Sequence, residues 1–193
     1  MGDTPLICGG YFNGPQKSCY SLKEDGSWKW ETSSDLNVAR QFAANGNVIV
    51  NNKLMIAGGT NGSRLTTFEV VAPNTKSLTL PISLPAGIFG SCIVPWDTDT
   101  YMIIAGCKDS SPCHSRLTYF INLANNTITN GPSLLTGRYI IGCHAFNLNG
   151  EDYIVVSGGG TASPFSSTEV ISKKNVGKGW QKSKTSQKFL EIT

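Results

Sequence analysis

The sequence predicts an all-β protein built from four copies of one strand-and-turn pattern. Three observations carry this prediction: apolar runs end in glycine at a regular period, the composition suits tight turns, and no stretch shows a helical period of comparable strength. The glycines that end the runs recur at intervals of about 50 residues, and they are Gly9, Gly58, Gly106 and Gly158. One such run indicates a strand and a turn, whereas four at one period indicate a repeat.

The composition supports many short strands. Of the 193 residues, 39% are hydrophobic, 15% are charged and 21 are glycine. Glycine reaches positive φ without steric cost, so this composition favours tight turns. The net charge is +3, and the lysines near the end of the chain are spaced as on a solvated face, so we expect no nucleic-acid partner. No stretch approaches the roughly 18 apolar residues of a membrane span.

Other residues keep the same register. A large apolar residue follows each glycine by about twenty residues, and this column comprises Trp30, Leu78, Ile128 and Trp180. Further along, arginine recurs in two repeats as Arg40 and Arg138, while Ile88 occupies that position in the repeat between them. Apolar runs without alternation, such as Tyr101–Ala105, indicate strands buried on both faces. Each repeat therefore predicts a four-stranded sheet stacked face to face on its neighbours.

These columns resemble the Kelch repeat, in which a glycine doublet ends the second strand, an apolar or aromatic residue lies on the third, and a tryptophan or leucine lies on the fourth. The resemblance covers the chain from Leu6 to about Gln187 and includes a Leu-x-x-x-Arg turn into the next repeat. The chain departs from the pattern where the third doublet reads Gly106-Cys107, and only Tyr20 keeps a tyrosine in the third-strand column.

The resemblance implies a Kelch-type β-propeller of about four blades, over approximately residues 1–36, 41–84, 90–134 and 141–187. Family propellers have six or seven blades, so the chain is expected to be an arc or fragment of a larger ring; a complete four-bladed ring is the alternative. The repeated glycines are expected to allow a sharp turn where packing leaves no room for a side chain, and the Trp30 column to pack between blades. An open arc would leave apolar faces in water and should aggregate or dimerise.

The six cysteines contain no CxxC pair. Cys8 and Cys19 fall on neighbouring strands, and Cys107 and Cys113 flank one loop. Both pairs suit disulfides in an oxidising compartment, with free thiols as the alternative. Cys92 and Cys143 occupy one column on the innermost strands of successive repeats, which we expect to lie too far apart to bond, so we predict buried free thiols there.

The cysteines and two glycosylation sequons, at Asn61 and Asn125, favour an extracellular or secreted protein, with a cytoplasmic one as the alternative. Residues Met1–Pro5 contain no apolar signal-peptide core, so we expect a mature form or a fragment.

No motif in the sequence predicts catalysis. Cys113-His114 and Cys143-His144 contain both histidines, and without CxxC or HxxxH spacing we expect no metal and no cofactor. Some relatives of the fold are copper-radical oxidases, which need a histidine pair, two tyrosines and a Cys–Tyr crosslink, and two histidines from separate blades do not match that set. No Gly-x-Ser-x-Gly elbow or phosphate-binding loop is found. A propeller-based enzyme such as a copper-dependent carbohydrate oxidase, or a carbohydrate-binding module, is the alternative.

The sequence instead predicts a protein-interaction scaffold that binds a protein partner through its loops. The second-to-third-strand loops and the fourth-to-first-strand turns are expected on opposite faces. The binding candidates are non-repeating loop residues, namely Tyr11, Phe12, Arg64, Lys108, Asp109, His114, Arg116 and Phe165. Arg40 and Arg138 recur with the scaffold, so we expect them to tie the turn to carbonyl groups of the next repeat; a role as interface hot spots is the alternative.

Overall fold

The computed structural model describes residues 4–23, 25, 27–46, 48–108, 113–160 and 164–183. Over these residues the protein is all-β, with four antiparallel sheets made of strands that are consecutive in the sequence. Sheet 1 contains β1 (Leu6–Cys8), β2 (Gln16–Leu22) and β3 (Trp30–Arg40). Sheet 2 contains β4 (Ile49–Val50), β5 (Lys53–Ala57), β6 (Thr67–Val71) and β7 (Leu78–Ser83).

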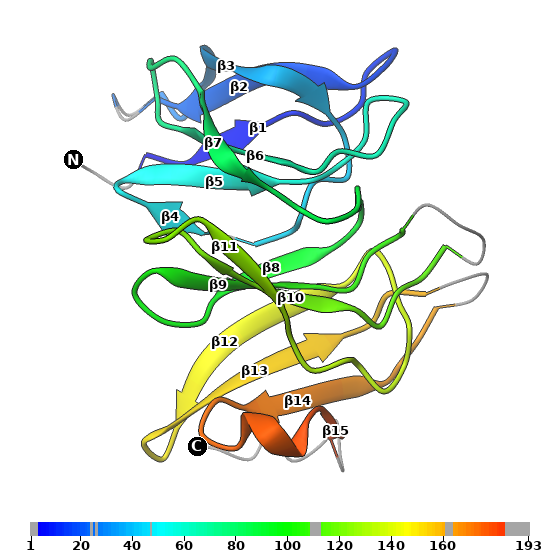
Figure 1. Ribbon diagram of the computed structural model, residues 1–193. Coiled ribbons are helices and arrows are strands. Elements are labelled where there is room, and N and C mark those ends of the chain that lie inside the picture. Colours follow the sequence, from blue (N-terminus) through cyan, green and yellow to red (C-terminus); the bar gives the residue numbers. More distant parts are fainter. Residues whose placement is uncertain are drawn as a thin grey trace.

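Sheet 3 contains β8 (Cys92–Pro95), β9 (Thr100–Ile104), β10 (Thr118–Asn122) and β11 (Thr127–Asn130). Sheet 4 contains β12 (Gly142–Leu148), β13 (Glu151–Ser157), β14 (Thr168–Ser172) and β15 (Gln181–Lys182), with a 3-10 turn at Val176–Lys178 before β15. Figure 1 shows the sheets stacked in chain order, with sheets 1 and 4 at opposite ends. A closed ring of these four sheets is therefore wrong for the described part of the chain.

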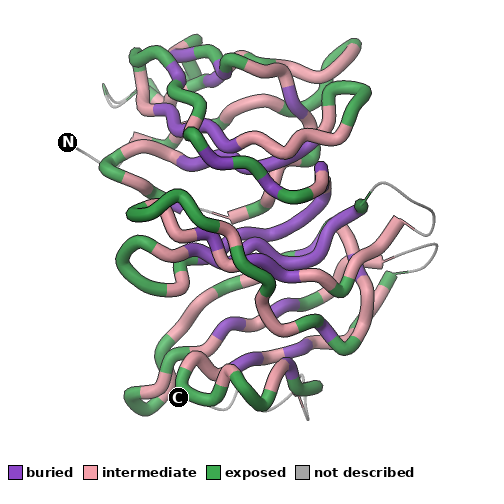
Figure 2. Tube along the Cα trace, viewed as in Figure 1, coloured by how far each residue is buried: buried purple, intermediate pink, exposed green. Residues whose placement is uncertain are grey.

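Three apolar layers fill the spaces between successive sheets. Leu36 packs with Ile56 between sheets 1 and 2, Phe68 with Ile103 between sheets 2 and 3, and Met102 with Ile154 between sheets 3 and 4. In Figure 2 the buried chain runs through the middle of the stack, while exposed segments gather at its ends and turns. Burying each such side chain stabilises the fold by about 1.5–3 kcal/mol.

Strand β9 shows why the sheets must stack on both sides. Ile103 faces sheet 2, whereas Met102 and Ile104 face sheet 4, because successive side chains of a strand point to opposite faces. All three side chains are fully buried. The unbroken apolar run therefore marks a strand covered on both faces, as the sequence predicted.

In the third repeat, the residues that correspond to the glycine doublet are Ala105 and Gly106, one residue earlier than the predicted Gly106-Cys107. Gly58 and Gly59 adopt φ of +60° and +92°, and the same pair of angles recurs at Ala105 (+54°) and Gly106 (+107°). A Cβ at Gly58 would lie 2.6 Å from the Ile88 carbonyl oxygen of the following turn. Gly106 is thus equivalent to the second glycine of the doublet, and Ala105 stands in the first position in spite of its Cβ.

The large apolar column is also corrected in two places. Trp180 is 3% exposed, packs in the layer between sheets 3 and 4, and donates its indole N–H to the Pro132 carbonyl at 2.8 Å. Leu78 is 55% exposed, and the buried residue is Ser77. Leu78 pairs with Val70 of β6 as Gln181 pairs with Val170 of β14, so Ser77 and not Leu78 corresponds to Trp180. Trp30 is 46% exposed, since it lies on the outer face of sheet 1, which no described residue covers.

Two buried ion pairs join successive sheets. The guanidinium of Arg138 donates to Glu169 at 2.7 Å and to the carbonyl oxygens of Gly158 and Ser167 at 2.9 and 3.0 Å. The Glu169 carboxylate also accepts the backbone N–H groups of Leu135 and Thr136, at 2.7 and 3.1 Å. One carboxylate thus holds both the arginine and the backbone of the turn that precedes sheet 4.

The turn before sheet 2 repeats this network. Arg40 donates to Glu69 and to the Gly58 carbonyl, and Glu69 accepts the backbone N–H groups of Asn37 and Val38 at 2.6 and 3.2 Å. Arg40 and Glu69 are 1% and 0% exposed. Both arginines therefore bond carbonyl groups of the next sheet.

An apolar pair occupies the same place between sheets 2 and 3. Ile88 takes the arginine position, because Gly59 donates to its carbonyl as Gly106 donates to that of Arg138. Tyr119 pairs with Ile103 of the adjacent strand as Glu69 pairs with Ile56. Both residues are buried in one apolar layer.

All six cysteines form disulfides. Cys8–Cys19 joins paired strands, and Cys107–Cys113 closes a loop. The prediction of free thiols at Cys92 and Cys143 is wrong, because their Cα atoms are 6.0 Å apart and they form the third bond. The innermost strands β8 and β12 lie side by side, which brings equivalent columns of neighbouring sheets within disulfide reach.

Removing the Cys92–Cys143 bond should destabilise the fold more than removing Cys107–Cys113. The two bonds span 51 and 6 residues, so loop-closure entropy predicts losses of about 4 and about 2 kcal/mol in the free energy of unfolding. Urea denaturation of the two paired Cys→Ala variants measures both losses. Equal losses would contradict the entropic ranking.

Replacing an Arg–Glu pair by an Ile–Tyr pair should preserve stability only when both residues are changed together. Arg138→Ile leaves a buried carboxylate without its cation and should cost about 3–5 kcal/mol of stability. Adding Glu169→Tyr copies the Ile88–Tyr119 pair and should recover most of that loss. Urea denaturation of both variants and of Glu169→Tyr alone forms a double-mutant cycle. If the losses simply added, the two positions would not be coupled.

Candidate functional site

The loops and the inter-sheet turns lie at one end of the molecule. Isolated bridges join Gln41 to Thr60, Phe89 to Cys107 and Tyr139 to Gly160, each linking the turn that enters a sheet to the loop between its second and third strands. The prediction of opposite faces is wrong, because in an antiparallel sheet the first strand begins at the end where the second finishes. We call this end the loop face.

An aromatic row crosses the loop face. Phe42, Phe89 and Tyr139 come from the three inter-sheet turns, with ring centroids 6.1 Å apart for Phe42–Phe89 and 6.5 Å for Phe89–Tyr139. Phe42 is 51% exposed, and Ile140, which follows Tyr139, is 55% exposed. Phe89 and Tyr139 are half-buried, so water reaches this apolar strip mainly at Phe42 and Ile140.

The backbone that presents this strip is strained. Phe42 and Ile140 adopt φ of +50° and +53°, and Gly90 occupies the corresponding place between them at +62°. Positive φ is uncommon for residues other than glycine and is a genuine outlier for a β-branched side chain such as Ile140. Strained backbone of this kind clusters at functional sites. The buried ion pairs of Arg40 and Arg138 brace two of the turns from below.

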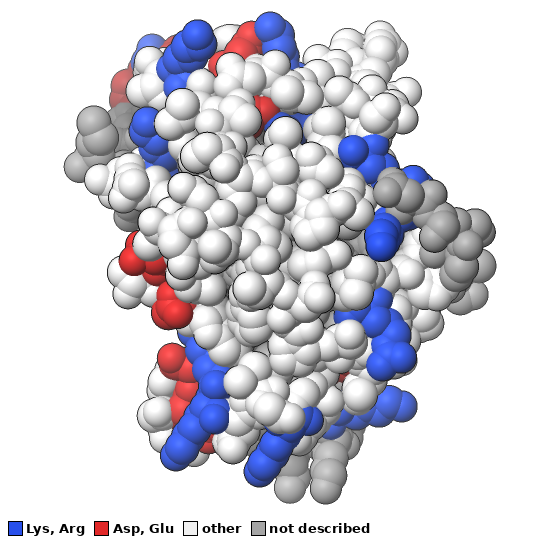
Figure 3. Space-filling view, in the orientation of Figure 1, with Lys and Arg blue, Asp and Glu red and all other residues white. Residues whose placement is uncertain are grey.

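The loops beside the aromatic row are cationic. Among the described residues of the second-to-third-strand loops, the charged side chains are Arg64, Lys108 and Arg116. The Arg64 guanidinium lies 5.5 Å from the centroid of the Phe89 ring. Figure 3 shows Lys and Arg along the edge that carries these loops, whereas the Asp and Glu visible at the sides gather mainly along the opposite edge. The described part of the loop face is therefore positively charged.

The predicted binding residues are spread over the loops of all four sheets. Tyr11 and Phe12 are 68% and 74% exposed on the loop of sheet 1. His114 is half-buried, and a Cβ at Gly137 would lie 2.7 Å from its ring. Phe165 lies 5.7 Å from the guanidinium of buried Arg138.

Only part of the predicted set converges. Arg64 contacts the aromatic row at Phe89. Lys108 and Arg116 are exposed and belong to one loop, and Asp109 lies outside the described residues. The sequence-based binding candidates did not include Phe42, Phe89, Tyr139 or Ile140. Their signal was positional, because each stands one or two residues after the Arg40–Ile88–Arg138 column.

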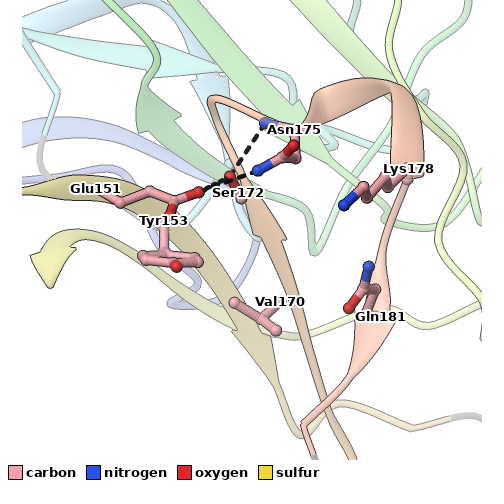
Figure 4. A pocket seen from close by; sticks show the side chains of 8 residues that line it. Glu151, Tyr153, Val170, Ser172, Asn175, Lys178 and Gln181 are labelled. Atoms are coloured by element: carbon pink, nitrogen blue, oxygen red, sulfur yellow. Dashed lines mark hydrogen bonds between the residues drawn. The ribbon is translucent and has the colours of Figure 1, made fainter. Parts of the chain in front are cut away.

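A pocket of about 220 Å³ lies away from the loop face, on the outer face of sheet 4. Figure 4 shows Tyr153, Val170 and Gln181 along it, with Glu151 accepting hydrogen bonds from Ser172 and Asn175. The Ser172 hydroxyl lowers the pKa of the Glu151 carboxyl. The pocket lining contains no histidine or cysteine. No group of three metal-ligating side chains is found in the described ranges.

Comparison with models of known protein families finds no match, and comparison with curated proteins finds no significant similarity. None of the helices within the described ranges is long and apolar enough to cross a bilayer. The loop face combines an aromatic row with neighbouring cationic side chains.

Proposed function

We propose that this chain is an arc of a Kelch-type β-propeller and serves as a protein-interaction scaffold without catalysis. The four stacked antiparallel sheets in chain order support the arc, and the recurring glycine doublets support the Kelch type. The observation that carries the function is the partly exposed aromatic row Phe42–Phe89–Tyr139, which lies on turns that contain residues at positive φ. Aromatic and arginine side chains dominate interface hot spots.

The ligand that fits this surface is an acidic segment with apolar side chains. Arg64, Lys108 and Arg116 supply positive charge, and the rings supply apolar area. Charge complementarity of this kind raises association rates and is weakened by salt. An extracellular setting is part of the proposal, since three disulfides are compatible with an oxidising compartment.

Selection of a random peptide library on the immobilised protein tests the recognition surface. We expect the enriched peptides to carry Asp or Glu beside apolar residues and to bind less tightly as salt rises. The triple variant Phe42→Ser, Phe89→Ser, Tyr139→Ser should lose at least about tenfold in affinity for them, because the loss of each buried aromatic contact costs 1 kcal/mol or more.

The control is Ile49→Ser, which removes an exposed apolar side chain, 57% exposed, beside the Asn51-Asn52 turn. It should bind the selected peptides as the wild type does. Peptides that bind the triple variant unchanged would refute the loop face as the site. Enrichment of no peptide, together with binding to a glycan array, would favour a carbohydrate-binding module.

The compartment is tested by the state of the cysteines and sequons. Asn61 and Asn125 are exposed, and the Thr127 hydroxyl donates to the Asn125 side-chain oxygen at 2.7 Å. Protein made through the secretory pathway should contain no free thiols and should carry N-glycans at these asparagines. Mass mapping before and after enzymatic deglycosylation detects them, with Asn125→Gln as the control. Six free thiols in protein from its native compartment would exclude the extracellular setting.

A further inference from the structure

The outer face of sheet 1 is an apolar surface that the described chain leaves open. Ile7, Tyr20 and Trp30 are 55%, 44% and 46% exposed. Tyr20 pairs with Ile7 across β1 and β2 as Glu69 pairs with Ile56 in sheet 2 and Glu169 with Val156 in sheet 4. In every later sheet, the residues at these positions pack against the preceding sheet.

The outer face of sheet 4 presents the opposite half of the same interface. Tyr153, Val155 and Val170 are half-buried on this face, and Phe146 stacks on Tyr153 with ring centroids 5.7 Å apart. Val155 alternates with Ile154 and Val156, which face sheet 3. The pocket of Figure 4 is a hollow in this face. The outer face of sheet 4 is therefore equivalent to the apolar faces with which sheets 1, 2 and 3 contact the next sheet.

The geometry points to head-to-tail association, in which sheet 4 of one copy of this chain packs on sheet 1 of a second copy. This inference rests on the proposed arc and names the source of the sheets that complete it. A contact between two different faces either closes into a ring or propagates. Two copies supply eight sheets, which is within the range of about 4 to 8 in which such rings close.

Contacts between successive sheets follow one pairing rule. A charged residue in the exit turn meets a charged one in the next sheet, as with Arg40 and Glu69, and an apolar one meets an aromatic one, as with Ile88 and Tyr119. Sheet 1 has Tyr20 at this position, so the rule predicts an apolar residue in the turn of the sheet that packs on it.

Sedimentation velocity of the purified full chain tests the association with one variant on each face. The wild type should sediment as a dimer or a larger assembly that dissociates on dilution. Trp30→Lys on sheet 1 and Val170→Lys on sheet 4 should each be monomeric, because each places a charge in an apolar contact. An equimolar mixture of the two should form a one-to-one dimer through the remaining intact pair of faces, at least about tenfold weaker than a closed wild-type dimer.

Matched controls separate the faces from general effects of added charge. Trp28→Lys changes a tryptophan that is 75% exposed in the β2–β3 connection, and Leu78→Lys changes an apolar residue that is 55% exposed in sheet 2. Both should associate as the wild type does. Circular dichroism checks that every variant folds, and Ile7→Lys serves on sheet 1 if Trp30→Lys does not fold.

Two results would overturn the inference. A wild-type chain that stays monomeric at the highest concentration reached would show that no second copy covers these faces. Association of Val170→Lys alone would show that like faces meet. If association fails while the selected peptides still bind the loop face, the inference is wrong and the proposed function stands. If peptides do not bind while the chain still associates, the proposed function is wrong and head-to-tail association stands.

Discussion

The whole structure depends on strands that are apolar on both faces. Met102 and Ile104 of β9 point to one neighbouring sheet and Ile103 to the other, so a sheet of this kind can be stable in water only when it is covered on both sides. Each sheet covers one apolar face of the sheet before it, and its own second face must be covered by the sheet after it. Stability is therefore largely a sum of nearest-neighbour interfaces, as in other repeat proteins. Among the described residues, the outer faces of sheets 1 and 4 have no sheet packed on them.

The inter-sheet turns show two physical solutions to one position. An arginine with a glutamate satisfies turn carbonyl and N–H groups in a buried place, at the cost of removing two charges from water. Isoleucine with tyrosine fills the same space by packing alone, as at Ile88 and Tyr119. Both solutions fix the turn that carries a ring of the aromatic row, so the contacts beneath the loop face determine its shape.

The all-β architecture and the order of the sheets could be predicted from the sequence, because glycine spacing and unbroken apolar runs are local signals. The finer register could not. Ala105 adopts the φ of a glycine, and the shorter link between β6 and β7 than between β14 and β15 places Ser77, not Leu78, at the position of Trp180. Neither effect could be recognised from the residue pattern alone. The Cys92–Cys143 bond was missed for a different reason, since the distance between neighbouring innermost strands is a property of sheet packing. The aromatic row combines residues from three turns, and its continuity appears only when those turns are brought together.

The nesting of two disulfides has a consequence for biosynthesis. Cys107 and Cys113 lie between Cys92 and Cys143 in the sequence, so a chain emerging from the ribosome exposes two wrong partners to Cys92 before the right one is made. The native set cannot be reached by joining cysteines in their order of appearance. Oxidative folding of this protein should therefore depend on a disulfide isomerase, or on delayed oxidation of Cys92 until sheet 4 has docked.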